Sequence, residues 1–163
     1  MRFIFKPMTE ADARAVLSWR YEGEYSFYNS DPADPQEDVR EMLDGSFLSA
    51  TDEQGNLVGF FCVGLTAQVP GGWQQGIYRD SALDIGLGMR PDLTGKGLGL
   101  DFVSAGLDFL RRERSPRMFR LVVATFNQRA ITVYERAGFR PVTVIPSSTL
   151  NGDAEFLLMT KEA

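Results

Sequence analysis

Three glycines alternate with other residues between Thr94 and Leu100, in the order Thr-Gly-Lys-Gly-Leu-Gly-Leu. Glycine lets a backbone bend with few steric limits and lets a ligand approach it closely. Apolar positions that continue at helical spacing to Leu110 predict a helix that begins at this turn. Backbone N–H groups in such a turn can share one concavity, and the helix start adds partial positive charge. The stretch therefore suits a phosphate-like anion. Its candidate ligand-binding residues are Gly95, Lys96, Gly97, Leu98, Gly99 and Leu100.

Two other glycine motifs and one structural explanation compete with this interpretation. A dinucleotide-binding fingerprint requires a third glycine where Leu100 stands, and a Walker-type loop requires Ser or Thr where Gly97 follows Lys96. A turn that needs glycine for its geometry alone would look the same. The glycine pattern by itself leaves this last alternative open.

Composition limits the chemistry that the chain can perform. The 163 residues suffice for one domain, predicted over 1–163, and they contain no histidine and one cysteine. Without imidazole, a general base must be a carboxylate, a tyrosine, a lysine or water, and a histidine-based metal site is excluded. Cys62 lies in the apolar run Phe-Phe-Cys-Val, which favours a buried small side chain over a nucleophile.

Charge and hydropathy bound the partners. No apolar run approaches the length of about 20 residues that a membrane span needs, and no signal peptide precedes the first strand, so we expect a cytoplasmic protein with no membrane contact. Residues 21–44 hold eight carboxylates and one arginine, a net −7, whereas residues 111–140 hold eight arginines and two glutamates, a net +6. These are either solvated faces or sides suited to a cationic substrate and an anionic cofactor. The overall charge of −5 disfavours nucleic acid as a partner.

Helices and strands alternate irregularly along the chain. We predict strands over 2–6, 47–51, 57–65, 82–89, 118–125, 140–145 and 155–159. We predict helices from Thr9, from Asp34-Pro35, from the glycine turn to about residue 114, and from an Asn127 cap to a Gly138 cap. Residues 21–30 are aromatic and acidic without a clear period, and 68–76 read as a loop with Trp73 at its tip.

A second block of residues follows the glycine turn by about thirty positions and reads Asn127-Gln-Arg-Ala-Ile-Thr-Val-Tyr134-Glu-Arg-Ala-Gly-Phe139. Together the two blocks resemble the GNAT family of N-acetyltransferases, which carries Gln/Arg-x-x-Gly-x-Gly/Ala at the start of its long helix and Asn, Ala and Tyr-Glu-x-x-Gly-Phe downstream. The resemblance covers nearly the whole chain. This sequence departs from the family pattern at Thr94, where Gln or Arg is usual, so one side-chain contact to phosphate is in doubt.

The resemblance implies an α/β (α+β) fold. This is a mixed, mostly antiparallel sheet of about seven strands, with about four helices and with strands 4 and 5 splayed apart. It also implies acetyl-CoA as cosubstrate and no metal. Backbone groups of Leu87 and Met89 would hydrogen-bond the pantetheine arm, the glycine turn would hold the pyrophosphate, and Asn127 would contact the arm or serve only as a helix cap. Gly86 and Gly88 in the fourth strand favour a bulge or a close backbone approach.

By the same resemblance, Tyr134 is the acid that reprotonates the departing thiolate, although its helical spacing also fits a core tyrosine. Asp84 is a candidate base or merely an exposed strand carboxylate, with Glu22, Glu24 or a water chain as alternatives. The acceptor is an amine, either a small molecule or a protein N-terminus or lysine, and direct transfer in a ternary complex is expected. The candidate acceptor-binding residues are Glu22, Glu24, Tyr25 and Trp73. A non-catalytic acetyl-CoA sensor is the alternative function, and a homodimer stays open.

Overall fold

The computed structural model describes all 163 residues, and residue contacts divide the chain into two compact units. The first unit comprises Met1–Cys62 and Leu87–Leu98, and the second comprises Val63–Gly86 and Gly99–Ala163. Strand β4 (Leu83–Met89) contributes residues to both units. The single domain over 1–163 stays a prediction.

Seven strands follow the order β1-β2-β3-β4-β5-β7-β6. Strands β4 and β5 pair in parallel, whereas β1 with β2, β2 with β3, β5 with β7, and β6 with β7 pair antiparallel. The predicted mixed, mostly antiparallel sheet is therefore confirmed. The parallel register joins Leu83 with Phe119 and Asp84 with Arg120, two residue pairs from strands of seven residues each. So short a pairing is what strands that splay apart would show.

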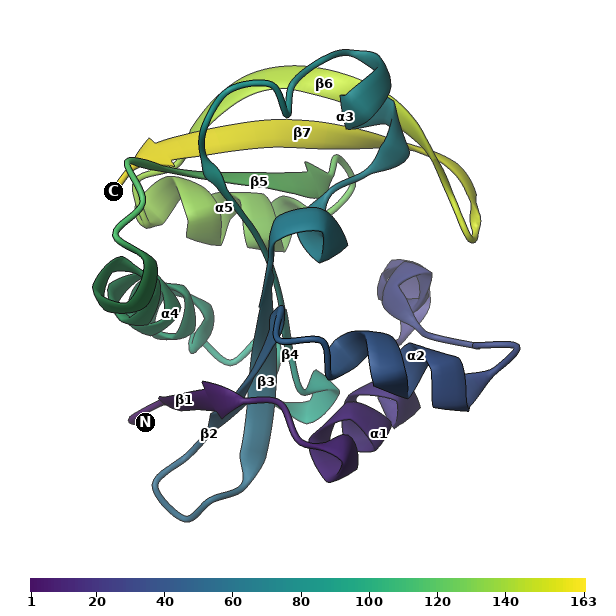
Figure 1. Ribbon diagram of the computed structural model, residues 1–163, viewed down its shortest axis with the longest axis vertical. Coiled ribbons are helices and arrows are strands. Elements are labelled where there is room, and N and C mark those ends of the chain that lie inside the picture. Colours follow the sequence, from purple (N-terminus) through teal and green to yellow (C-terminus); the bar gives the residue numbers. More distant parts are fainter. The chain divides into compact units, whose positions relative to one another are not determined.

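The first unit contains three strands before β4, two α-helices and two short 3₁₀ helices. They are β1 (Ile4–Pro7), α1 (Glu10–Ser18), η1 (Gly23–Tyr28), α2 (Pro35–Met42), β2 (Phe47–Thr51), β3 (Leu57–Val63, with Val63 in the second unit) and η3 (Pro91–Leu93). Figure 1 shows α1 and α2 side by side. Their inward side chains Ala13, Val39 and Met42 pack with Met8 in one apolar cluster, against which Phe60 of β3 also packs. Burial of each large apolar side chain contributes about 1.5–3 kcal/mol.

The two helix starts in this unit follow the predicted capping. The Thr9 hydroxyl accepts a hydrogen bond from the Asp12 N–H at 3.2 Å. The Asp34 carboxylate accepts from the N–H groups of Gln36 and Glu37, and Pro35 occupies the first turn, where its missing N–H costs nothing. Helix α2 ends at Met42. Within residues 21–30, which showed no clear period, Gly23–Tyr28 form the 3₁₀ helix η1.

The second unit contains three strands after β4, three α-helices and one 3₁₀ helix. They are η2 (Gly64–Ala67), α3 (Pro70–Gln74), α4 (Gly99–Arg114), β5 (Met118–Ala124), α5 (Gln128–Arg136), β6 (Arg140–Thr149) and β7 (Gly152–Glu162). In Figure 1, β6 and β7 form one long curved hairpin beside β5, and α4 and α5 contact each other. Helix α4 buries one stripe of side chains, whose members Phe102, Val103, Gly106, Leu107 and Leu110 recur at helical spacing.

Helix α3 corrects the prediction of a loop over 68–76. Pro70 starts this helix, and the N–H of Gly71 donates to the hydroxyl of Ser147 on β6 at 2.9 Å. A Cβ on Gly71 would lie 2.0 Å from the carbonyl oxygen of Pro146, so only glycine lets the helix backbone rest on β6. This tertiary contact outweighs the low helix propensity of two consecutive glycines. The four predicted helices are α1, α2, α4 and α5, and α3 is the fifth.

Several strand boundaries also differ from the prediction: β1 spans Ile4–Pro7 instead of 2–6, and β7 runs to Glu162 instead of residue 159. Strand β3 ends at Val63 instead of residue 65, because Gly64 has a φ of +77° and turns the chain into η2. The last two strands extend to a tight turn at residues 150–151, followed by Gly152 with a φ of +97°. The Asn-Gly pair thus predicted the position of the hairpin correctly. The length of its two strands was underestimated because their ends are polar.

Candidate active site

The glycine turn between η3 and α4 uses its first two glycines for their backbone conformation. Gly95 has a φ of +71° and Gly97 a φ of +79°, a region that costs other residues about 1–2 kcal/mol. A Cβ built on Gly97 meets no atom within 4 Å, so the space beside its backbone is open. Lys96 between them is exposed. The turn thus combines a left-handed backbone with approachable peptide groups, the two features that an anion-binding turn needs.

Thr94 directly precedes the glycine turn and is hydrogen-bonded to η3. Its hydroxyl donates to the carbonyl oxygen of Pro91 at 2.7 Å, and its backbone N–H reaches the same oxygen at 3.3 Å. The side chain is therefore engaged with the end of η3. The residue that replaces the family's usual Gln or Arg thus has a local structural role in the turn.

Arg90 fixes the segment that leads from β4 into η3. Its guanidinium donates to both carboxylate oxygens of Asp92, at 2.6 and 3.1 Å, and to the Leu57 carbonyl oxygen of β3 at 2.8 Å. These hydrogen bonds raise the pKa of Arg90 and lower the pKa of the Asp92 carboxyl. The bidentate ion pair between Arg90 and Asp92 therefore fixes the backbone where the chain leaves β4 for the turn.

The third glycine of the motif, Gly99, is required for a different reason, which is close packing between two helices. A Cβ on Gly99 would lie 3.1 Å from Cγ2 of Val133, so α4 begins in close contact with α5. Leu100 follows in the first turn of α4 and is half-buried. With 16 residues, α4 is long enough for aligned peptide dipoles to leave partial positive charge at this end.

On β4, Leu87 and Met89 flank a glycine that is pressed against β3. A Cβ on Gly88 would lie 2.4 Å from the Phe60 ring, so the predicted close backbone approach is a ring of the neighbouring strand. Past Met89, the Arg90 N–H donates to the Val58 carbonyl oxygen at 2.9 Å. The Met89 carbonyl oxygen accepts a hydrogen bond from the Tyr21 hydroxyl at 2.6 Å.

Asn127 caps α5, as predicted. Its side-chain oxygen accepts from the Ala130 N–H at 3.1 Å, and its carbonyl oxygen accepts the N–H of Ile131. The cap fixes the position of the asparagine at the entry to the helix. A contact with a pantetheine arm stays a prediction, and both roles are compatible.

Tyr134 is held at the other end of α5 by a Schellman motif. The Phe139 N–H donates to the Tyr134 carbonyl oxygen at 2.9 Å, the Gly138 N–H donates to that of Glu135 at 3.0 Å, and Gly138 has a φ of +102°. The Tyr134 and Phe139 rings meet edge to face with centroids 6.0 Å apart. Tyr134 is 9% exposed, so its ring is both buried and locked in place.

The profile of the acetyltransferase (GNAT) domain matches residues 2–140, which is most of the chain. The chain belongs to the GNAT acetyltransferase family. The predicted resemblance is thereby confirmed. None of its helices combines the length and apolar character that crossing a membrane requires.

Several curated relatives of this GNAT domain are named mycothiol acetyltransferase. The chain is 31% identical to the one from Salinispora arenicola (strain CNS-205) over 142 residues, which are 83% of this chain and 43% of the relative. It is 35% identical to the one from Salinispora tropica over 97 residues, 57% of this chain and 28% of the relative. The GNAT chain thus spans less than half the length of these curated relatives.

Solved structures share the fold at low sequence identity. A spermidine N-acetyltransferase chimera from Vibrio cholerae and hSSAT has a TM-score of 0.71 at 18% identity, covering 99% of this chain and 96% of the other. The aminoglycoside acetyltransferase AAC(6')-Ib in complex with coenzyme A has a TM-score of 0.71 at 20% identity, with 99% and 95% covered. These likenesses establish the GNAT fold. GNAT acetyltransferases use acetyl-CoA, which is the cosubstrate that the sequence predicted.

Asp84 lies in a buried polar network instead of on an exposed strand face. Its carboxylate accepts from Arg120 Nε at 2.5 Å and Nη2 at 2.9 Å, and from Gln68 Nε2 at 2.8 Å, and the two charged side chains are 7% and 5% exposed. Arg120 also donates to the Ile77 carbonyl oxygen at 2.8 Å and lies over the Tyr78 ring, 5.0 Å from its centroid. The network ties residues 68–80 to the paired starts of β4 and β5.

Trp73 is attached to the same network. It is 55% exposed on α3, and its ring lies 5.4 Å from that of Tyr78. The Tyr78 hydroxyl accepts from the Val69 N–H at 2.9 Å, and burial raises the pKa of Tyr78. Trp73 and Asp84 are two candidate site residues that the sequence did not link. The structure connects them through Tyr78 and Arg120.

The remaining candidates lie on residues 21–29, here called the acidic loop. Glu22 and Glu24 are exposed at the start of η1, and Tyr25 is half-buried beside them. Asn29 closes the loop, because its side chain accepts from the Tyr21 N–H at 2.7 Å and donates to the Tyr21 carbonyl oxygen at 3.3 Å. Neither Tyr21 nor Asn29 was predicted from the sequence.

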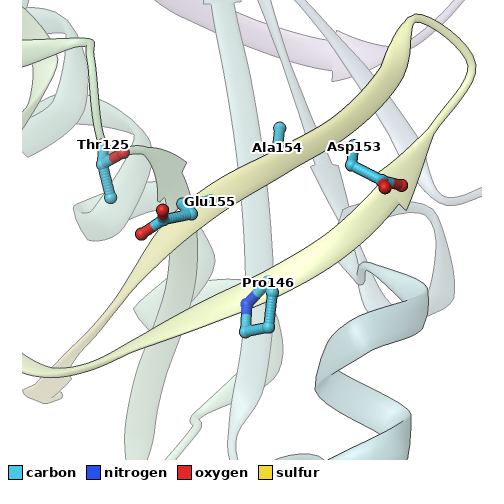
Figure 2. A pocket seen from close by; sticks show the side chains of 5 residues that line it. All are labelled: Thr125, Pro146, Asp153, Ala154 and Glu155. Atoms are coloured by element: carbon cyan, nitrogen blue, oxygen red, sulfur yellow. The ribbon is translucent and has the colours of Figure 1, made fainter.

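A hollow of about 380 Å³ was also absent from the predictions. Figure 2 shows its lining, which combines the end of β5 with the facing segments of β6 and β7: Thr125, Pro146, Asp153, Ala154 and Glu155. Two of these side chains are carboxylates, and the hollow is open to solvent. No group of three or more Cys, Asp or Glu side chains is arranged to hold a metal ion.

Proposed function

We propose that the chain is an acetyl-CoA-dependent N-acetyltransferase that moves the acetyl group to a primary amine by direct transfer in a ternary complex. The observation that carries the proposal is the glycine turn at the entry to a long helix, in which Gly95 and Gly97 hold left-handed conformations and the space beside Gly97 is open. Membership of the GNAT family supplies the reaction class. Acceptor binding and proton transfer are argued below from individual residues.

The residues present fit acetyl-CoA. Backbone N–H groups of the turn and of the helix start would hold the pyrophosphate through Gly95, Lys96, Gly97, Leu98, Gly99 and Leu100. Leu87 and Met89 would offer backbone groups to the pantetheine arm, and Asn127 would contact the same arm. When bound, the cosubstrate supplies an activated acetyl thioester. A backbone N–H near Leu87 to Met89 would polarise its carbonyl.

Proton transfers fall to side chains. Tyr134 would donate a proton to the departing thiolate. The group that accepts the proton of the amine is Asp84, Glu22, Glu24 or a water chain. Because Asp84 already accepts three hydrogen bonds from Arg120 and Gln68, the carboxylates of the acidic loop or water are the stronger candidates.

The acceptor is a cationic amine, bound by Glu22, Glu24, Tyr25 and Trp73. Its chemistry spans small molecules and a protein N-terminus or lysine. Family relatives named for mycothiol, spermidine and aminoglycosides set the first compounds to test. We further propose a cytoplasmic setting, because the buried Cys62 is the sole cysteine and no disulfide framework exists.

A thiol-release assay tests the function. Acetyl-CoA is incubated with the protein and with spermidine, an aminoglycoside, amino acids or short peptides in turn. We expect release that depends on at least one amine. Slow release that no amine stimulates, together with tight acetyl-CoA binding, would instead favour the alternative, a non-catalytic acetyl-CoA sensor.

A further inference from the structure

One peptide group on β4 is held from both sides. The Tyr21 hydroxyl donates to the Met89 carbonyl oxygen at 2.6 Å, and the Arg90 N–H of the same peptide group donates to the Val58 carbonyl oxygen at 2.9 Å. Successive residues of an extended strand present their N–H and C=O groups to opposite edges. Since Arg90 faces β3, Met89 presents its N–H and C=O to the edge that faces away from β3. Tyr21 therefore occupies one acceptor on that edge.

The same tyrosine is the first residue of the acidic loop. Asn29 clamps the Tyr21 backbone through both its N–H and its carbonyl oxygen, at 2.7 and 3.3 Å. The Tyr21 ring also meets the Tyr28 ring edge to face, with centroids 6.4 Å apart. The loop is thus closed at its base, and Glu22 follows Tyr21 directly. One residue joins the carboxylates of the loop to the edge of β4.

We propose that Tyr21 is a positioning residue that sets the register of the acidic loop against the acetyl-CoA-binding edge of β4. The proposal rests on the proposed function. By occupying the Met89 carbonyl oxygen, Tyr21 leaves the Met89 N–H and the Leu87 backbone groups on that edge for the pantetheine arm. The Asn29 clamp then holds Glu22 and Glu24 at a fixed distance from that edge. The amine and the thioester carbonyl are thereby aligned before they react, which is how orientation accelerates a two-substrate reaction.

The replacement Tyr21→Phe tests this role, because it removes the hydroxyl and keeps the ring. Loss of one hydrogen bond that aligns the reactants should lower kcat with the amine roughly three- to tenfold. The Kd of acetyl-CoA and the slow amine-independent release of thiol should stay unchanged. Asn29→Ala, which opens the clamp, should act in the same direction, and Asn29→Asp, which keeps the acceptor for the Tyr21 N–H, should restore part of the rate.

Tyr28→Phe is the matched control, since it removes another hydroxyl from the same loop, and it should retain the wild-type rate. Amide hydrogen exchange supplies a readout other than activity: the Arg90 amide and residues 21–29 should exchange faster in Tyr21→Phe than in the wild type. Wild-type turnover in Tyr21→Phe, or equal losses in Tyr21→Phe and Tyr28→Phe, would overturn the proposal.

Failure of the proposed function would be recognised separately. If the wild type turns over no amine, the acetyltransferase assignment fails, and the exchange measurement in the presence of acetyl-CoA decides the role of Tyr21. Faster exchange at Arg90 and over 21–29 in Tyr21→Phe would still support the anchoring of the loop to β4. Unchanged exchange at those amides would overturn it.

Discussion

Tyr134 combines burial, a fixed backbone and a phenolic hydroxyl. Its carbonyl oxygen closes the Schellman motif and its ring packs on Phe139, and neither of these two contacts uses the phenolic oxygen. Replacing Tyr134 by Phe keeps those contacts and removes the proton. A role as proton donor is thereby separable from a role in the core.

We expect Tyr134→Phe to lower kcat on the order of 10²-fold if proton donation limits the rate. The Kd of acetyl-CoA and the urea midpoint of unfolding should change little, because packing on Phe139 is retained. Steady-state kinetics with the best amine, with calorimetric titration of acetyl-CoA alongside, measure both quantities. Full turnover by the variant would reject the assignment of Tyr134 as the acid.

Asp84, in contrast, is a buried carboxylate whose hydrogen-bond partners indicate a structural role. Removing its charge leaves the Arg120 guanidinium buried without compensation, which typically costs about 3–5 kcal/mol. We therefore expect Asp84→Asn to lower the free energy of unfolding by about that amount. Arg120→Gln should destabilise the chain comparably and lower activity alongside, since either change loosens residues 68–80. Urea unfolding and kcat are measured on both variants. Loss of kcat at wild-type stability in Asp84→Asn alone would return Asp84 to the role of general base.

At the scale of the elements, the effect of backbone strain in the glycine turn can be measured separately from the effect of a side chain that blocks the ligand. Gly97 and Gly55 both have left-handed φ values, +79° and +86°, and open space where a side chain would stand. A β-branched residue at either position carries similar strain, of about 1–2 kcal/mol. Only the residue in the turn before α4 is expected to touch the cosubstrate.

Gly97→Val should therefore weaken acetyl-CoA binding by at least about tenfold, a loss of about 1.4 kcal/mol. Gly55→Val, in the turn between β2 and β3, is the control and should bind acetyl-CoA as the wild type does. Titration calorimetry supplies both dissociation constants. Equal affinity in the two variants would remove the turn from the phosphate site.

The turn between β2 and β3 responds to pH through Asp52. Its carboxylate accepts from the N–H groups of Asn56 and Gln54 and from the Asn56 side chain, and these hydrogen bonds lower the pKa of Asp52. A pKa that lies lower in the folded chain gives stability that is present above the unfolded pKa and is lost as the pH falls through the folded value.

Wild-type protein should accordingly melt at a higher temperature than Asp52→Asn at pH 7, and the difference should vanish as the pH falls below the unfolded pKa of about 3.9 and then through the lower folded value. Thermal melts from pH 7 to pH 2.5 follow the change. A constant difference across that range would show that the carboxylate charge does not stabilise the turn.

Local signals located most elements, and tertiary contacts determined the rest. Thr9, Asp34, Asn127 and Gly138 stand where the sequence predicted the helix ends they cap. Helix α3 escaped prediction because Gly71 is required by contact with β6, which no local pattern reveals. A helix cap depends on residues within one turn, whereas the docking of α3 depends on a strand about seventy residues later in the sequence.

Arg120 is the residue that a sharper interpretation of the sequence would have used. It interrupts an otherwise apolar strand, Met-Phe-Arg-Leu-Val-Val-Ala, and a charge in such a strand requires a buried partner. That signal pointed to a carboxylate on a neighbouring strand without saying which one. The contact of Tyr21 with Met89 left no such trace, since a hydroxyl bound to a distant carbonyl follows from no local pattern.

At the scale of the whole molecule, the family match covers residues 2–140, while the curated relatives extend well beyond the length of this chain. The short pairing of β4 with β5 and the strand order agree with a GNAT fold. The fold therefore follows from the molecule as a whole, and the proposed reaction class follows from its family. In our proposal, the choice of acceptor depends on a few exposed side chains, chiefly Glu22 and Glu24, whose charge suits any cation.

The most direct test follows the acetyl group itself. Wild-type protein is mixed with acetyl-CoA labelled in the acetyl group and with the amine that gives the fastest thiol release, and the products are identified by mass spectrometry. We expect one labelled acetyl group on the amine nitrogen for each thiol released. Thiol release without labelled amine, for every amine tried, would contradict the account.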